Sequence, residues 1–344
     1  MPVLNPSALI DQRVEALRHY HDAAGLDRAE LDLSGGIDSA VMAGLLVLAL
    51  GTDKLTLVYS SINSGGKTHK RAEDLAGALG VPLVFHDLTA TYEAMVGAMI
   101  ENLVAAGWSR QAIDDRVASD KTILGSIRSC LRAPLGRGYL RLSGNGIRHG
   151  TGNECEDRWL RFYQKGGDGE VDSNPVAMLA KGEIYQLAKA LGERLNATDA
   201  YRQILLAKPT PELWGTTESH TDEDEIGSYL GLSDVGHSFY SYIDPDTGAY
   251  SRVGLIERVS RFADHHPSLF SDSLSEAQMT SLAQAATAHP SFQGVDASII
   301  ARTLRAARRA ERVTRHKFNP GCPSIGTREE LVEAGILTDE LPAL

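Results

Sequence analysis

Short apolar segments alternate with longer amphipathic ones between residues 29 and 105. The pattern predicts strands in AELDLS (29–34), KLTLVYSS (54–61) and VPLVFHDL (81–88), and helices over 38–50, 68–80 and 91–105. Strands that alternate with helices form right-handed βαβ crossovers and a parallel sheet. The sequence therefore predicts an α/β fold with a doubly wound parallel sheet, and a ligand site beyond the carboxyl ends of its strands.

Helical patterns lie on both sides of this alternating part. Residues 5–25 begin with a capping Asn or Ser and carry apolar residues on one face, which predicts an amphipathic lid helix. A helix over 121–136 and a strand within 138–157 are expected next. The helices expected in the C-terminal part lie at 180–195, 221–232, 254–266, 275–289 and 297–317. We expect one domain over 1–344, with a helical C-terminal part from about residue 180.

Composition narrows the classes of protein. Lys and Arg total 34 and Asp and Glu total 45, a net charge of −11, and no basic run stands out. This balance argues against a nucleic-acid or anionic-membrane partner. The chain has three cysteines and none belongs to a C-x-x-C pair, which favours neither a disulfide framework nor a cysteine zinc site. Without a signal-peptide pattern at the N-terminus, a cytoplasmic location is expected.

The stretch SGGIDS follows the first predicted strand and opens the first predicted helix of the sheet. It consists of Ser34, Gly35, Gly36, Ile37, Asp38 and Ser39. Two glycines let backbone N–H groups approach a ligand, and the helix N-terminus favours an anion, so the stretch predicts a phosphate cradle. It is neither a Walker A loop nor a G-x-G-x-x-G fingerprint. Asp38 suits Mg²⁺ held against a polyphosphate, and the alternative is an Asp that only caps the helix.

SGGIDS is similar to the S-G-G-x-D-S pyrophosphate loop of the N-type ATP pyrophosphatases. That resemblance implies adenylation of a substrate, release of pyrophosphate, and displacement of AMP by a nitrogen or sulfur nucleophile. It implies the reaction class but leaves the substrate open.

Four further segments, in family order, resemble the ammonia-dependent NAD synthetases. They are GTGNECED (150–157), FYQKGGDGEVDSNPVAMLAKGEIYQLAKALG (162–192), KPTPELW with TDEDEIG (208–214 and 221–227), and TRHKFNPG (314–321). The resemblance implies amidation of nicotinic acid adenine dinucleotide (deamido-NAD) by ammonia through an acyl-adenylate, which gives NAD, AMP and pyrophosphate. It further implies a fold like that of the adenine nucleotide alpha hydrolases, and a homodimer.

The same resemblance assigns roles to individual residues. ATP contacts are implied for Ser34, Gly35, Gly36, Ile37, Asp38, Ser39, Thr151, Lys181 and Thr210. Deamido-NAD contacts are implied for Arg132, Lys165, Asp172, His316 and Lys317. Asp38 and Glu156 are the implied Mg²⁺ ligands, and Asp38 and Lys181 the implied catalytic pair. The acidic run 222–225 reads equally well as a solvated helix start.

The chain departs from the family pattern at two places. Cys130 stands where a substrate-binding arginine is expected, so either Arg128 or Arg137 replaces it or the substrate differs. The segment at about 230–290 is longer than the family predicts, and suits a lid, a dimer element or a partner site. Its His265 and His266 have no carboxylate or cysteine at ligand spacing, which favours exposed polar residues over a metal site.

Two alternatives to NAD synthesis remain at this stage. One is an adenylating amide ligase for a different small-molecule carboxylate, and the other is a non-catalytic module that binds ATP or NAD. No glutaminase signature surrounds the three cysteines, so free ammonia or a separate glutaminase is the expected nitrogen source.

Overall fold

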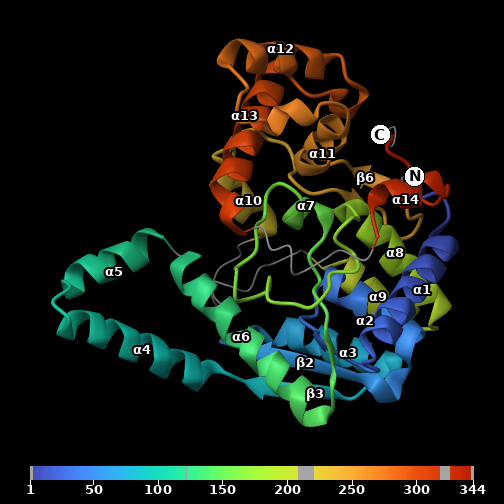
Figure 1. The fold of residues 1–344 in the computed structure, drawn as a ribbon, viewed down its shortest axis with the longest axis vertical. Helices are drawn as coiled ribbons and strands as arrows, with labels where there is room; N and C mark the ends of the chain where they lie inside the picture. Colours follow the sequence, from blue (N-terminus) through green and yellow to red (C-terminus); the bar gives the residue numbers. More distant parts are fainter. Residues whose placement is uncertain (1–2, 121, 208–220, 318–325, 342–344) are drawn as a thin grey trace.

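The computed structural model describes residues 3–120, 122–207, 221–317 and 326–341. Its main sheet has four parallel strands in the order β3-β2-β1-β4 (Figure 1). The strands are β1 (Arg28–Asp32), β2 (Leu55–Ser61), β3 (Leu83–Asp87) and β4 (Gly146–Arg148). The predicted α/β fold with a parallel sheet is confirmed.

The helices described in the N-terminal half are α1 (Pro6–Ala24), α2 (Ile37–Leu50), α3 (Gly66–Leu79), α4 (Thr89–Ala105), α5 (Arg110–Ser119), α6 (Thr122–Ser143) and α7 (Glu154–Asp157). Those of the C-terminal half are α8 (Lys181–Arg194), α9 (Thr198–Leu205), α10 (Asp222–Leu230), α11 (Leu255–His265), α12 (Glu276–Thr287), α13 (Ala297–Thr314) and α14 (Arg328–Glu333). A small antiparallel hairpin, β5 (Tyr242–Ile243) and β6 (Tyr250–Arg252), precedes α11.

Crossover handedness distributes the helices over the two faces of the sheet. The chain moves from β1 to β2 to β3 through α2 and α3, then returns past β1 to β4 through α6. Because such crossovers are right-handed, α2 and α3 cover one face and α6 the other. β4 lies at an edge of the sheet, and its buried Arg148 forms ion pairs with Glu30 and Asp32 of β1.

The lid assigned to residues 5–25 is wrong. The helix itself forms, but α1 packs against α2 and α8, and its apolar face is buried there, with Leu9 and Leu17 fully covered. Arg18 adds hydrogen bonds to the carbonyl oxygens of Leu48 and Ala49 at the end of α2. An amphipathic pattern predicts a buried face, but the pattern does not say which partner buries it.

Two helices form an arm that projects away from the sheet. Figure 1 shows α4 and α5 extending together to one side of the molecule. Tyr92 is the one buried residue of α4, and α5 has none. Met99, Leu103 and Trp108 are exposed large hydrophobic residues on this arm.

The buried hydrophobic residues form two main clusters. One packs around the sheet and includes side chains of α1, α2, α3, α8 and α9. The other lies among α10, α11, α12 and α13, which gather at the opposite end of the molecule from the sheet (Figure 1). The segment at 230–290 therefore contributes a core, because α11 is almost entirely buried. α5 and α9 are helices that our sequence analysis did not predict.

Candidate functional site

A glycine loop joins β1 to α2 at the carboxyl end of β1. Gly35 has a φ of +77°, and a Cβ on it would lie 2.3 Å from the carbonyl oxygen of Thr68, so only glycine fits. Ser34 Oγ accepts from the Gly36 amide at 3.3 Å and lies 3.1 Å from Ser39 Oγ. The N-cap residue of α2 is Gly36, and no side chain of the described residues caps this helix. Its first N–H groups and the positive end of its dipole are thus suited to an anion.

Lys181 forms a charge centre beside this loop. Its ammonium donates to Asp38 Oδ2 at 2.7 Å and to Glu156 Oε1 at 3.1 Å. The Lys181 side chain is only 3 % exposed, and its nitrogen lies 5.4 Å from the centre of the Tyr240 ring. The three charged residues lie in the first turns of α2, α7 and α8, so the fold brings three helix starts to one point.

Asn153 connects two of these helix starts. Its side-chain nitrogen donates to Asp38 Oδ1 at 2.9 Å, while its oxygen accepts from the amides of Cys155 at 3.0 Å and Glu156 at 3.3 Å. Asn153 is fully buried. It therefore caps α7 and also fixes the Asp38 carboxylate, the two tasks that an Asn at an N-cap can combine.

Burial and charge shift the pKa values of this centre. Burial disfavours the charged form of Lys181, but Asp38 and Glu156 outweigh it, and the pKa of the ammonium rises well above its usual value. Burial raises the pKa of Glu156 to about 7, against the opposing effect of Lys181. Burial likewise raises the pKa of Asp222 to about 6. Three carboxyl groups thus interact with one ammonium, and the excess negative charge favours an added cation.

The loop and the charge centre lie on the wall of a cavity of about 500 Å³. Small-molecule sites commonly have roughly 300 to 1,000 Å³. The sequence-predicted residues that line the cavity are Ser34, Gly35, Gly36, Ile37, Asp38, Arg132, Thr151, Glu156, Lys181 and Lys317. Apolar and aromatic side chains also line it, namely Val58, Tyr59, Phe162, Tyr163, Tyr185, Ile204, Ile226, Tyr229 and Tyr240. Such a wall suits a planar base as well as phosphates.

Two cations approach the cavity from other elements. Arg132 Nε of α6 donates to the carbonyl oxygen of Ser60 at 3.2 Å. Lys317, just after α13, donates from Nζ to the carbonyl oxygens of Tyr163 at 2.8 Å and Arg161 at 3.2 Å. Backbone acceptors therefore hold both cations at the wall.

Other predicted residues lie elsewhere. Lys165 and His316 are exposed, and neither lines the cavity. Asp172 lies outside the lining as well, where its carboxylate accepts from Arg137 at 3.0 Å. Ser39 is buried behind the loop. Thr210 lies outside the described residues.

The structure shows where Cys130 and the neighbouring arginines of α6 lie relative to the cavity. Cys130 does not line the cavity, and its thiol donates to the Lys165 carbonyl oxygen at 4.0 Å. Arg128 is buried with its guanidinium 5.2 Å from the Tyr92 ring centre, and Arg137 pairs with Asp172. Among the arginines of α6, Arg132 therefore reaches the cavity, whereas Arg128 and Arg137 do not.

Several residues of the cavity wall were not assigned from the sequence. Asp222 and Glu225 line the cavity, and Glu225 is only 5 % exposed. Burial raises the pKa of Glu225 to about 7. The same acidic run also starts α10, because Thr221 and Asp224 form a capping box. The run therefore starts a helix as expected, but Glu225 is buried rather than solvated. The spacing of Asp222 and Glu225 on one helical face was the available signal for their place on the cavity wall.

Neither a cluster of metal-binding side chains nor a membrane-spanning helix is found in the described residues. In the ranges that the structure describes, there is no group of three or more His, Cys, Asp and Glu that could hold a metal ion. His266 stacks on Phe262 with ring centres 4.2 Å apart, and His265 is exposed. No helix among the described residues has the length and apolar character needed to cross a membrane.

Comparison with known proteins places this site in a family. Residues 9–244 match the family model described as NAD synthase. The NH(3)-dependent NAD(+) synthetase of Alkaliphilus oremlandii is 31 % identical over 264 residues, which cover 74 % of this chain and 92 % of that protein. The enzyme of the same name from Methanosarcina acetivorans is 31 % identical, with 64 % of this chain and 78 % of that protein covered. The solved NMN synthetase from Francisella tularensis shares the fold, with a TM-score of 0.60 and 20 % identity over 92 % of this chain and 99 % of its own. The chain belongs to the NAD synthase family.

Proposed function

We propose that the protein is a ligase that forms a carbon–nitrogen bond, amidating deamido-NAD with ammonia at the expense of ATP. The products are NAD, AMP and pyrophosphate. The observation that carries this proposal is the Lys181 ammonium between Asp38 and Glu156, at 2.7 and 3.1 Å, beside the glycine loop. Family membership and the 31 % identical relatives named NH(3)-dependent NAD(+) synthetase support it.

The chemistry follows from charge. The carboxylate of the nicotinic acid ring attacks the α-phosphorus of ATP, the bond from that phosphorus to the α,β-bridging oxygen breaks, and pyrophosphate leaves with its added negative charge. Ammonia then attacks the acyl carbon, loses a proton and displaces AMP. The α2 N-terminus and Lys181 stand where a departing phosphate can be stabilised, and such preorganised donors reduce the barrier. The protein's main task is to hold two anionic reactants together.

Asp38 and Glu156 fit a Mg²⁺ ion that accompanies ATP. Both are hard oxygen donors on the cavity wall, with side chains 17 % and 25 % exposed. Mg²⁺ usually takes one or two protein carboxylates and completes its shell with water and substrate phosphates, so two carboxylates suffice. When bound, the ion supplies charge neutralisation on the phosphates. Asn153 keeps the Asp38 carboxylate oriented toward that position.

The dinucleotide half of the proposal rests on Arg132 and Lys317. Both line the cavity at a distance in sequence from the loop, and each offers positive charge to an anionic substrate. Lys165, Asp172 and His316 remain predicted contacts of the dinucleotide, and Thr210 of ATP. Cytoplasmic location and ammonia from solution or from a separate glutaminase also remain predictions.

The exposed apolar arm supports the proposed homodimer. The side chain of Trp108 is 63 % exposed, that of Met99 47 % and that of Leu103 40 %. Large apolar residues exposed on one surface usually mark a site of interaction with another protein. A second copy of the chain is the occupant that the family resemblance implies. Its arm would present the same apolar residues, as an isologous interface requires.

The proposal is tested by incubating the purified protein with Mg-ATP and deamido-NAD, with ammonium or with glutamine. Ammonium-dependent formation of NAD and AMP in equal amounts is expected. A parallel reaction replaces deamido-NAD with nicotinic acid mononucleotide, because the Francisella tularensis neighbour is named an NMN synthetase. Turnover of the mononucleotide alone would identify a different carboxylate substrate, and ATP binding without turnover of either acid would favour the non-catalytic alternative.

A further inference from the structure

The helix starts that carry Glu156 and Lys181 are joined by two hydrogen bonds that their backbone amides donate. The Glu154 amide donates to the Leu179 carbonyl oxygen at 2.8 Å, and the Lys181 amide donates to Cys155 Sγ at 3.5 Å. A displacement of the first turn of α7 therefore also displaces the first turn of α8, because these two hydrogen bonds connect them. What holds this pair of turns in place determines where the two charged side chains point.

Arg328 holds the start of α8. Glu183, two residues after Lys181, accepts from the Ala180 amide at 2.8 Å and so caps the helix. Arg328 of α14 donates to both oxygens of the Glu183 carboxylate, each at 2.8 Å. Glu183 is fully buried, and the Arg328 side chain is 11 % exposed. Burial opposes the charge on Arg328, but Glu183 outweighs it and the pKa of Arg328 is raised, while burial raises the pKa of Glu183 against the opposing effect of Arg328.

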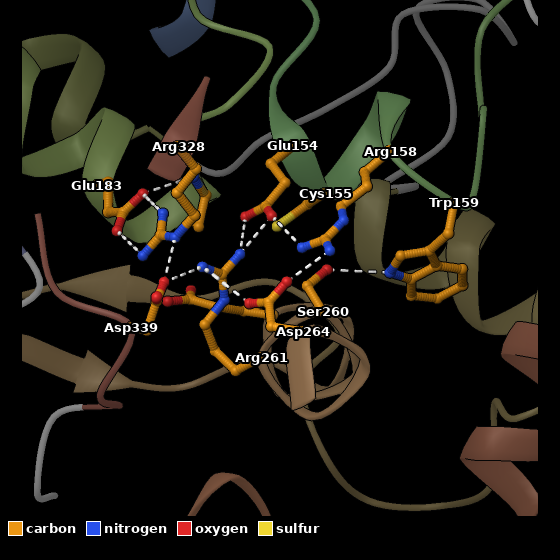
Figure 2. A network of polar contacts seen from close by, with 12 residues as sticks. Glu154, Cys155, Arg158, Trp159, Glu183, Ser260, Arg261, Asp264, Arg328 and Asp339 are labelled. Carbon is orange, nitrogen blue, oxygen red and sulfur yellow. Dashed lines mark hydrogen bonds and ion pairs between the residues drawn. The ribbon is translucent and has the colours of Figure 1, made fainter. Parts of the chain in front are cut away.

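Arg261 holds the start of α7 in the same way. This residue of α11 donates to both carboxylate oxygens of Glu154, and the two side chains are 2 % and 3 % exposed. Asp339 joins the two arginines, accepting from Arg328 Nε at 2.9 Å and from Arg261 Nη1 at 3.3 Å. Figure 2 shows Arg328, Asp339 and Arg261 as one continuous chain of contacts between Glu183 and Glu154.

We infer that Arg261, Asp339 and Arg328 form a brace that positions Glu156 and Lys181 for the adenylation step, acting through Glu154 and Glu183. None of the three brace residues contacts the cavity, so they are positioning residues. The inference rests on the proposed function for the identity of the step. All three lie after residue 244, where the family match ends, so the C-terminal part contributes to the active site that the matched part carries.

Electrostatics explains why the brace acts as a unit. Removing one partner from a buried ion pair leaves the other charge uncompensated, which costs more than the pair contributes. Glu154 also pairs with Arg158 at 2.8 Å, so a broken brace relaxes by moving Glu154 toward Arg158 or Glu183 toward solvent. Because these carboxylates lie two residues from Glu156 and Lys181, such a movement displaces the charge centre, and a displacement of about 1 Å can cost roughly 100-fold in rate.

The test compares Arg328→Gln, Arg328→Lys and Arg261→Gln with wild type in ATP–pyrophosphate exchange dependent on deamido-NAD. We expect the exchange rate to fall about 10- to 100-fold in both glutamine variants, with the KM for ammonium in the complete reaction changed less than about twofold. Arg328→Lys keeps the charge but not the two-pronged geometry, so it should recover part of kcat. Asp339→Asn should give a smaller loss, because it removes the link and leaves both carboxylates paired.

Arg258→Gln is the matched control. Arg258 is also a buried arginine of α11, but it donates to the carbonyl oxygens of Val253, Ser291 and Gln293 rather than to a carboxylate near the charge centre. We expect it to lower the thermal midpoint while kcat per folded molecule stays near wild type. Equal kcat losses in Arg258→Gln and Arg261→Gln at equal thermal midpoints would overturn the inference, because the effect would then be one of stability alone.

The dissociation constant of Mg-ATP, measured by calorimetry, separates the brace from the proposed function. A wild-type protein that binds Mg-ATP without making NAD would overturn the function. The brace would still be judged by binding, where Arg328→Gln should weaken Mg-ATP and Arg258→Gln should not. Unchanged Mg-ATP binding and unchanged exchange in Arg328→Gln and Arg261→Gln would overturn the brace and leave the function standing.

Discussion

The Lys181 ammonium lies 2.7 Å from Asp38 Oδ2, although 143 positions separate the two residues in the chain. Lys181 is buried, and within the part of the chain that the structure describes its ammonium donates to Asp38 and Glu156. Removing its charge therefore affects both the carboxylates and the substrate phosphates. Lys181→Met should reduce kcat for pyrophosphate release about 100- to 1,000-fold, as loss of a preorganised donor does.

The effect of Lys181→Met is measured as the rate of pyrophosphate release by the folded variant in a single turnover. Lys181→Arg keeps a positive charge in the same place and serves as the comparison, with an expected smaller loss. If Lys181→Met released pyrophosphate at the wild-type rate, the ammonium would have no part in the adenylation step.

The pH dependence of the site should have opposite signs for stability and for Mg²⁺ binding. The pKa of Glu156 rises from 4.5 to about 7 on folding. The folded state then binds more protons than the unfolded one, so this contribution to stability is present below about pH 4.5 and is lost as the pH rises through about 7. Mg-ATP binding needs the ionised carboxylate and should instead strengthen over that range.

Calorimetric titration of Mg-ATP at a series of pH values measures this, together with urea unfolding of the protein without nucleotide. Glu156→Gln should flatten both pH profiles, because the group that titrates is gone. A wild-type Mg-ATP affinity that stayed constant from pH 5.5 to pH 8 would contradict the assignment of Glu156 near the nucleotide; these limits span the pKa of about 7.

A single added methyl group in the glycine loop should lower both the stability of the protein and its affinity for ATP. In Gly35→Ala the added Cβ would meet the Thr68 carbonyl oxygen at 2.3 Å, and the φ of +77° is itself strained for alanine. We expect a loss of about 1 to 3 kcal/mol in stability and a weaker affinity for ATP. Gly80→Ala is the matched control, since its φ is +69° but nothing lies within 4 Å of the added Cβ. Equal ATP affinities in the two variants would contradict the close packing of the loop.

Arg132 and Cys130 should respond differently to substitution. Arg132 lines the cavity, so Arg132→Ala should raise the KM for deamido-NAD about 10- to 100-fold, the loss expected for a charged hydrogen bond. Cys130→Ser should leave the KM within about twofold of wild type, because the thiol lies outside the cavity. Steady-state kinetics with deamido-NAD as the varied substrate measures both KM values. A larger rise in KM for Cys130→Ser than for Arg132→Ala would contradict this assignment and indicate that the substrate binds near Cys130.

The arm predicts the oligomeric state. Trp108→Asp should convert a dimer into a monomer by light scattering coupled to gel filtration, because it places a charge in the proposed apolar interface. Leu142→Asp is the control, since Leu142 is 86 % exposed but lies at the end of α6, outside the arm. A monomeric wild-type protein, or a dimer that survives Trp108→Asp, would contradict the proposed interface.

Periodicity and motifs predict the sheet well. Local patterns suffice for β1 to β3 and the helices between them, because each element buries a face that its own residues encode. The role of α1 could not be read in this way, since its apolar face fits a lid and a core equally. α5 has no buried residue, and so it lacks the periodic apolar signal that identifies a packed helix.

Motifs predicted the loop and the charge centre, but not what supports them. Asp38, Glu156 and Lys181 belong to separate motifs, and only the folded chain shows that Asn153 orients one and that Arg261 and Arg328 hold the helices of the others. Long-range ion pairs leave no local pattern in a single sequence. Lys165 and His316 also match family motifs, but their side chains do not line the cavity. A motif match by itself therefore does not place a side chain at the cavity.

The most direct test of the central claim uses deamido-NAD labelled with ¹⁸O in its nicotinate carboxylate, incubated with Mg-ATP, ammonium and wild-type protein. Attack of that carboxylate on the α-phosphorus predicts that one labelled oxygen passes to the phosphate of AMP for each NAD formed, as mass spectrometry of AMP would show. Formation of NAD with unlabelled AMP, or release of AMP without NAD, would contradict an acyl-adenylate made at this site.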